Sequence, residues 1–135
     1  MRKLWVLAFV AVTALPAYAA TPLIDAVKAG DPAALRAALQ KPADVNAAEA
    51  DGMTALHWAA RNNDLAAARA LVRAGANVKT ASRYGITPLT LAAENGSAPM
   101  LDLLLRAGAD ARATLPEGQT VLMTAARTGN VVRIG

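Results

Sequence analysis

The sequence predicts an all-α solenoid of stacked helix-turn-helix units, with three full repeats and a partial fourth. Two observations predict this fold class. Residue columns recur every 33 positions along the 135-residue chain, and a fixed period of this length is typical of a repeat architecture. The composition is 55% hydrophobic but only 4% aromatic. Much of the apolar share is alanine, which favours helices because its side chain loses no conformational entropy.

Three columns run through all four units. They are Thr21, Thr54, Thr87 and Thr120; Leu23, Leu56, Leu89 and Leu122; and Ala26, Ala59, Ala92 and Ala125. Threonine is a good N-cap, because its hydroxyl accepts a bond from a free helix N–H. Pro22 and Pro88 follow at the first helical position, where the missing N–H of proline costs nothing. The Leu and Ala columns are three residues apart, so they share one face of a short helix.

A second helix is expected in each full unit, as over 65–74 and 98–107. Gly75 and Gly108 follow these segments, and helices often end at a glycine in the left-handed conformation. A further glycine column predicts the tight turn into each next unit: Gly52, Gly85 and Gly118. The first unit has Pro42 where its neighbours have glycine, so a different helix end is expected there. The fourth unit has the first helix only.

These motifs resemble the ankyrin repeat, in which Gly-x-Thr-Pro-Leu opens a helix and Leu-Leu-x-x-Gly-Ala-Asp closes the unit. The third unit, GITPLTLAAENG and then MLDLLLRAGADA, carries the pattern most fully, and the second reads GMTALHWAARNN and then ARALVRAGANV. The resemblance covers residues 21 to about 130. It implies a domain over 20–135 with repeats at about 20–50, 51–83, 84–116 and, in part, 117–135. It also implies a non-catalytic, monomeric module that binds another protein.

The first nineteen residues have the pattern of a cleavable signal peptide. Arg2 and Lys3 precede an apolar run that ends at Pro16, and Ala17-Tyr18-Ala19 places small residues at the cleavage site. The run is too short for a membrane-spanning helix. We expect cleavage after Ala19 and export to a periplasm or to the outside of the cell, with no membrane attachment afterwards.

Composition and spacing provide few candidates for chemistry. The chain has no cysteine, which excludes disulfides, thiolate metal sites and thiol nucleophiles. Beyond residue 19 it has 12 basic and 10 acidic side chains and no basic run with stacking aromatics, so no nucleic-acid partner is expected. The single histidine, His57, matches the family's Thr-Pro-Leu-His position, which implies that it braces the turn; the alternative is a base or a metal ligand. We expect no enzyme activity, no metal and no cofactor.

The resemblance implies that a partner contacts the hairpin tips and the concave face of the first helices. Interface-prone types and variable columns on these elements give the candidate partner-binding residues Met53, Trp58, Arg61, Arg83, Tyr84, Glu94, Glu117 and Arg127. Two alternatives stay open. Trp58 packs against the neighbouring repeat instead, or the variable columns are solvent positions without a role.

The last repeat stops early in its second helix, near Val131. A solenoid that ends there leaves apolar surface uncovered. We therefore also consider that the chain is the N-terminal part of a longer exported protein, whose activity lies beyond residue 135.

Overall fold

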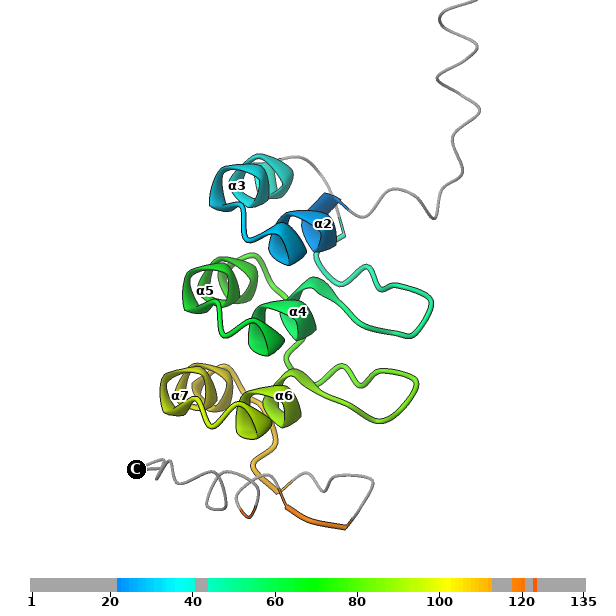
Figure 1. Ribbon diagram of the computed structural model, residues 1–135, viewed down its shortest axis with the longest axis vertical. Helices are drawn as coiled ribbons and strands as arrows, with labels where there is room; N and C mark the ends of the chain where they lie inside the picture. Colours follow the sequence, from blue (N-terminus) through cyan, green and yellow to red (C-terminus); the bar gives the residue numbers. More distant parts are fainter. Residues whose placement is uncertain (1–21, 41–43, 113–117, 121–122, 124–135) are drawn as a thin grey trace, which may run out of the picture.

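The computed structural model of this protein describes residues 22–40, 44–112, 118–120 and 123. Within them the helices are α2 (Pro22–Ala29), α3 (Pro32–Gln40), α4 (Ala55–Arg61), α5 (Leu65–Arg73), α6 (Pro88–Glu94) and α7 (Ala98–Arg106). They form three helix pairs stacked one on another: α2, α4 and α6 make one layer, and α3, α5 and α7 make the other (Figure 1). The all-α stack of helix pairs is therefore as the sequence predicts.

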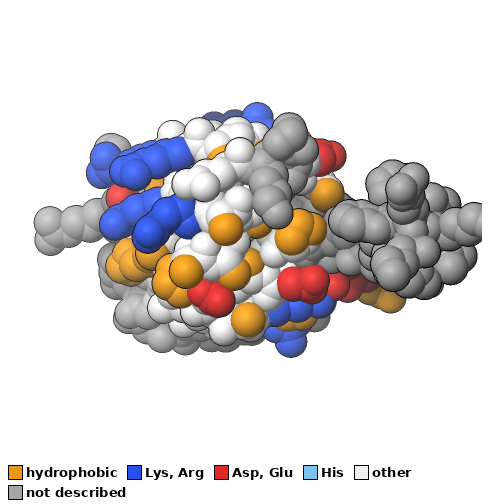
Figure 2. Space-filling view, turned by 90° about the horizontal axis from the view of Figure 1, so that it is seen from above, with side chains coloured by type: hydrophobic (Ala, Val, Ile, Leu, Met, Phe, Trp, Pro, Cys, Tyr) orange, Lys and Arg blue, Asp and Glu red, His pale blue; other side chains and the backbone are white. Residues whose placement is uncertain are grey.

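The two layers have different surfaces. Hairpins 44–54 and 77–87 project beside the first helices, on the side away from α3, α5 and α7 (Figure 1). Viewed along the stack from the first repeat, Lys and Arg side chains gather on the side of the second helices (Figure 2). The exposed arginines of those helices are Arg36, Arg69, Arg73 and Arg106.

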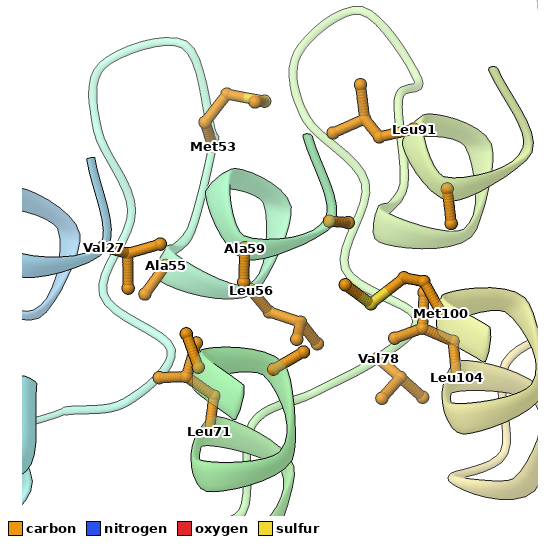
Figure 3. Packing of buried hydrophobic residues seen from close by; sticks show 14 of the residues in the cluster. Val27, Met53, Ala55, Leu56, Ala59, Leu71, Val78, Leu91, Met100 and Leu104 are labelled. Atoms are coloured by element: carbon orange, nitrogen blue, oxygen red, sulfur yellow. The ribbon is translucent and has the colours of Figure 1, made fainter. Parts of the chain in front are cut away.

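The core is made of the repeating columns. Leu56 and Leu89 are each 1% exposed, and Ala59 and Ala92 are fully buried. Neighbouring repeats meet through buried apolar side chains; Val27 of α2, for example, faces Ala55 of α4 (Figure 3). The first helices contact one another more extensively than the second helices do.

Polar side chains begin the helices at the predicted positions and at further ones. Thr87 is the N-cap of α6, where its Oγ1 accepts the Thr90 N–H at 3.2 Å. Asp64 and Ser97 do the same for α5 and α7. Neither residue belongs to the threonine column, so these two caps were not predicted. Thus α5, α6 and α7 each begin at a residue whose side chain accepts a helix N–H.

The hairpins are closed by backbone hydrogen bonds at equivalent positions. Glu49 N–H donates to the Met53 carbonyl at 2.9 Å, and Ser82 N–H donates to the Ile86 carbonyl at 2.8 Å, one period later. Consecutive hairpins are also joined, since Arg83 N–H donates to the Asp51 carbonyl at 2.8 Å. The hairpins therefore continue the stack of the helices.

Some predictions lie outside the described residues. These are the signal peptide at 1–19, the altered helix end at Pro42 and most of the fourth repeat. Among the described helices, none is long and apolar enough to cross a membrane.

Two glycines test the hairpin contact. Gly52 and Gly75 have positive φ angles of 87° and 94°, so alanine at either costs about 1–2 kcal/mol of backbone strain. A Cβ at Gly52 would also lie 3.0 Å from Arg83 N and 3.1 Å from Ser82 Cα, whereas one at Gly75 meets nothing within 4 Å. Gly52→Ala is therefore expected to lower the free energy of unfolding in urea more than Gly75→Ala. Equal losses would contradict the close packing of the two hairpins.

Candidate functional site

Trp58 lies at the centre of a charged cluster on the first-helix layer. Its indole N–H donates to Glu49 Oε2 at 2.8 Å, and the same glutamate forms an ion pair with Lys28. Lys28 Nζ lies 4.4 Å from the centre of the indole ring, and Arg61 Cζ lies 5.5 Å from it. Both distances are within the range of cation–π attraction. The cluster therefore joins α2, the first hairpin and α4.

This arrangement leaves Trp58 half-buried. The ring packs against Lys28 of the preceding repeat, which agrees with the packing alternative for this residue, yet part of the ring stays open to solvent. Glu49 was not among the sequence candidates. Its position in the hairpin, 9 residues before Trp58, gave no signal, because the pairing depends on how the hairpin folds back over α4.

Four of the other candidates lie on the surface. Arg61, Arg83, Tyr84 and Glu94 are exposed, and Tyr84 is a large side chain with 66% of its surface accessible. The backbone beneath Tyr84 is nevertheless fixed, since its N–H donates to Ser82 Oγ at 3.2 Å. Tyr84 lies on the hairpin that follows the one carrying Glu49 of the Trp58 cluster.

Met53 corrects an expectation. Expected as an exposed hairpin-tip residue, Met53 is only 6% exposed and belongs to the hydrophobic core. Its backbone is held in the hairpin closure, where its carbonyl accepts the Glu49 N–H and its own N–H donates to Asp51 Oδ1 at 2.9 Å. Its side chain points from this hairpin toward the next repeat (Figure 3). The equivalent Ile86 is half-buried, so an apolar residue recurring in this column was the available signal. Glu117 and Arg127 lie outside the described residues.

His57 is fully buried and connects two repeats. Its Nδ1 lies 3.1 Å from Thr54 N and 2.8 Å from Thr54 Oγ1, and its Nε2 lies 2.9 Å from the Ile86 carbonyl oxygen. Because a carbonyl only accepts, Nε2 carries the proton and Nδ1 accepts from Thr54. The side chain thus braces its own cap and the next hairpin, as the family position implies.

The environment of His57 opposes its charged form. Burial lowers the pKa of the imidazole from its ordinary value of 6.5, and the bond to Ile86, the charge of Asp51 and the Thr80 carbonyl oppose this only in part. A buried neutral imidazole with both nitrogens engaged has no free lone pair for a substrate or a metal. Within the described part of the chain, no group of three or more His, Asp or Glu side chains is placed to hold a metal ion.

Two asparagines at equivalent positions, each directly after a first helix, also connect the repeats. Asn62 Nδ2 donates to the Val27 carbonyl at 3.3 Å, and Asn95 Nδ2 donates to the Ala60 and Arg61 carbonyls, each at 2.9 Å. Each amide satisfies carbonyls at the end of the preceding first helix. The 33-residue spacing of this pair was visible in the sequence, but it does not distinguish framework from recognition.

A family model of ankyrin repeats, in three copies, matches residues 23–114. The chain therefore belongs to the ankyrin-repeat family, whose repeats generally serve as protein–protein interaction modules and are typically non-catalytic. A search of curated proteins found no matching relative.

The buried histidine gives a pH prediction. Its folded pKa lies below the unfolded value, so the unfolded chain takes up the proton first as the pH falls. The stability that the neutral imidazole contributes is complete above pH 6.5 and is lost below it, with a slope of up to about 1.4 kcal/mol per pH unit. Urea unfolding between pH 7.5 and pH 5.5 measures this slope.

The control variant is His57→Thr, which places in this column the residue type of Thr90. It is expected to be less stable at pH 7.5 by about 1–3 kcal/mol, because the bond to the Ile86 carbonyl is lost, and to show a flatter pH dependence. Parallel pH curves for the two proteins would contradict the assignment of the slope to His57.

Proposed function

We propose that this chain is an exported, monomeric binding module that holds another protein through its hairpin tips and first-helix layer. The observation that carries the proposal is the contrast within hairpin 77–87. Its backbone is held by Ser82 and by the bond from Arg83 N–H to Asp51, whereas the side chains of Arg83 and Tyr84 are exposed.

A recognition surface benefits from this contrast. Association costs less when the binding groups are already ordered, and tyrosine, tryptophan and arginine are enriched among residues that dominate binding energy. These residue types are present on two elements: Arg83 and Tyr84 are exposed on hairpin 77–87, and Arg61 and the half-buried Trp58 lie on α4. Met53 is not part of this surface, because it is buried.

The Trp58 cluster provides the second part of the surface. Lys28 and Arg61 each lie within cation–π distance of the indole ring, and Glu49 accepts the indole N–H. A large aromatic surface that is already oriented loses little side-chain entropy on binding. The proposal includes no cofactor, no nucleic acid and no catalytic step.

Binding is tested by substituting the exposed residues. Affinity capture from the exported fraction of the source cells, with the chain as bait, is expected to recover a partner that Arg83→Ala/Tyr84→Ala loses. Each change is expected to shift the melting temperature by no more than about 2 °C, since surface substitutions stay within about 0.5 kcal/mol. Arg106→Ala, on the opposite layer, is the matched control. A partner retained equally by all three proteins would contradict this binding surface.

Export rests on the pattern of residues 1–19 and has its own test. The chain is expressed with a C-terminal tag in a bacterium, and the tagged product is isolated from the periplasm and sequenced from its N-terminus. Cleavage after Ala19 predicts Ala20 as the first residue. An intact Met1 on a product confined to the cytoplasm would contradict export.

A further inference from the structure

A groove lies between α3 and α5, away from the hairpins. It has a volume of about 160 Å³, and the apolar side chains that line it include Leu35 and Leu39 from α3 and Ala67 and Ala70 from α5. Arg36 lines it as well, and Asp31 and Asp64 lie where α3 and α5 begin. The groove is therefore apolar along its length and charged at its margins.

The repeat explains why the groove is open. One period after Ala67 and Ala70, α7 carries Met100 and Leu103, and Met100 is fully buried. The large side chains thus fill the space where α7 packs on α5, whereas α5 offers only methyl groups toward α3. The groove therefore follows from the small residues that α5 carries at these two positions.

The charged residues that line the groove are Arg36, Asp31 and Asp64, and α5 carries two further arginines, Arg69 and Arg73. Arg36, Arg69 and Arg73 are exposed, and no ion pair involves them within the described residues, in contrast with Arg106, which pairs with Asp102 at 2.9 Å. The two aspartates are already engaged. Asp31 Oδ1 accepts N–H groups of α3, and Asp64 Oδ1 accepts the Ala67 N–H at 3.1 Å, so the positive ends of the helix dipoles offset part of their charge.

We propose that this groove is a second binding site, which takes an acidic peptide segment of a partner protein. One large apolar side chain of the segment enters between α3 and α5, and acidic residues beside it pair with Arg36 and Arg73. The volume favours a peptide over a lipid, because a cavity of about 150 Å³ holds a group the size of benzene, which matches one side chain rather than an acyl chain. An apolar anchor in a pocket with charged surroundings is a common arrangement of binding hot spots.

The test uses the full chain and fluorescence anisotropy of a labelled probe peptide that has one leucine followed by three glutamates. Saturable binding is expected. Ala70→Leu, which copies Leu103 of the next repeat, is expected to weaken it at least about tenfold by filling the groove, equivalent to about 1.4 kcal/mol. Its melting temperature is expected to stay the same or rise, because a void is filled.

Arg36→Gln tests the charge without touching the core, since Arg36 is exposed. It is expected to weaken binding severalfold at low salt and less at high salt. Arg106→Gln is the control, and binding should be unchanged. The Arg36 variant decides the matter if Ala70→Leu does not fold.

Four results would overturn the proposal. They are no saturable binding to the unmodified chain, undiminished binding to both groove variants, equal binding of a peptide with lysines in place of the glutamates, and equal binding of a peptide with glycine in place of the leucine. Displacement of the probe by octanoate at lower concentrations than by unlabelled peptide would assign the groove to an acyl ligand instead. The groove lies on the layer opposite the hairpins, so none of these results bears on binding there.

Discussion

Each helix in this protein depends on its neighbours for stability. The first helices α4 and α6 have seven residues each and the second helices α5 and α7 have nine, whereas isolated helices shorter than about 12–15 residues are marginal in water. What stabilises them is the alignment of apolar columns in adjacent repeats, which buries Leu56, Leu89, Ala59 and Ala92 almost completely. The polar contacts follow the same period: the hairpin closures are equivalent, and the asparagines join each first helix to the one before. The 33-residue step is therefore the constraint on which cap, hairpin and core all depend.

Most of the fold could be predicted from this step, because every column has a local physical role that a single sequence reveals. The ends of α5 and α7 lie within a residue of the expected ones, and the threonine caps occupy the expected positions. The surface could be predicted less well. Burial of Met53 and the pairing of Trp58 with Glu49 depend on how a hairpin folds back across a helix. Residue type at a tip position does not determine that geometry.

Hydrogen bonding and exposure distinguish the polar residues that join the repeats from those whose side chains are open to solvent. His57 lies within α4, and both of its ring nitrogens are engaged within the stack. Asn62 and Asn95 directly follow α4 and α6, and their side-chain amides donate to carbonyls of the preceding repeat. Arg61, Arg83, Tyr84 and Glu94 have side chains that extend into solvent. On the opposite layer, the exchange of Met100 and Leu103 for Ala67 and Ala70 opens a groove without disturbing the period. A constant frame thus permits different surfaces on its two sides, and the proposed sites use both.

The stacking register is tested most directly by a tandem duplication of residues 51–83, which adds one whole period and keeps every column aligned. In a solenoid, each added repeat contributes its own stability and one further interface. The account predicts a cooperative protein with more helix by circular dichroism and a higher urea midpoint than the original chain. A duplication of residues 51–81, which shifts the columns by two positions, serves as the control and should be less stable. A lower midpoint for the in-register protein, or equal midpoints for the two duplications, would contradict the claim that aligned columns hold the fold together.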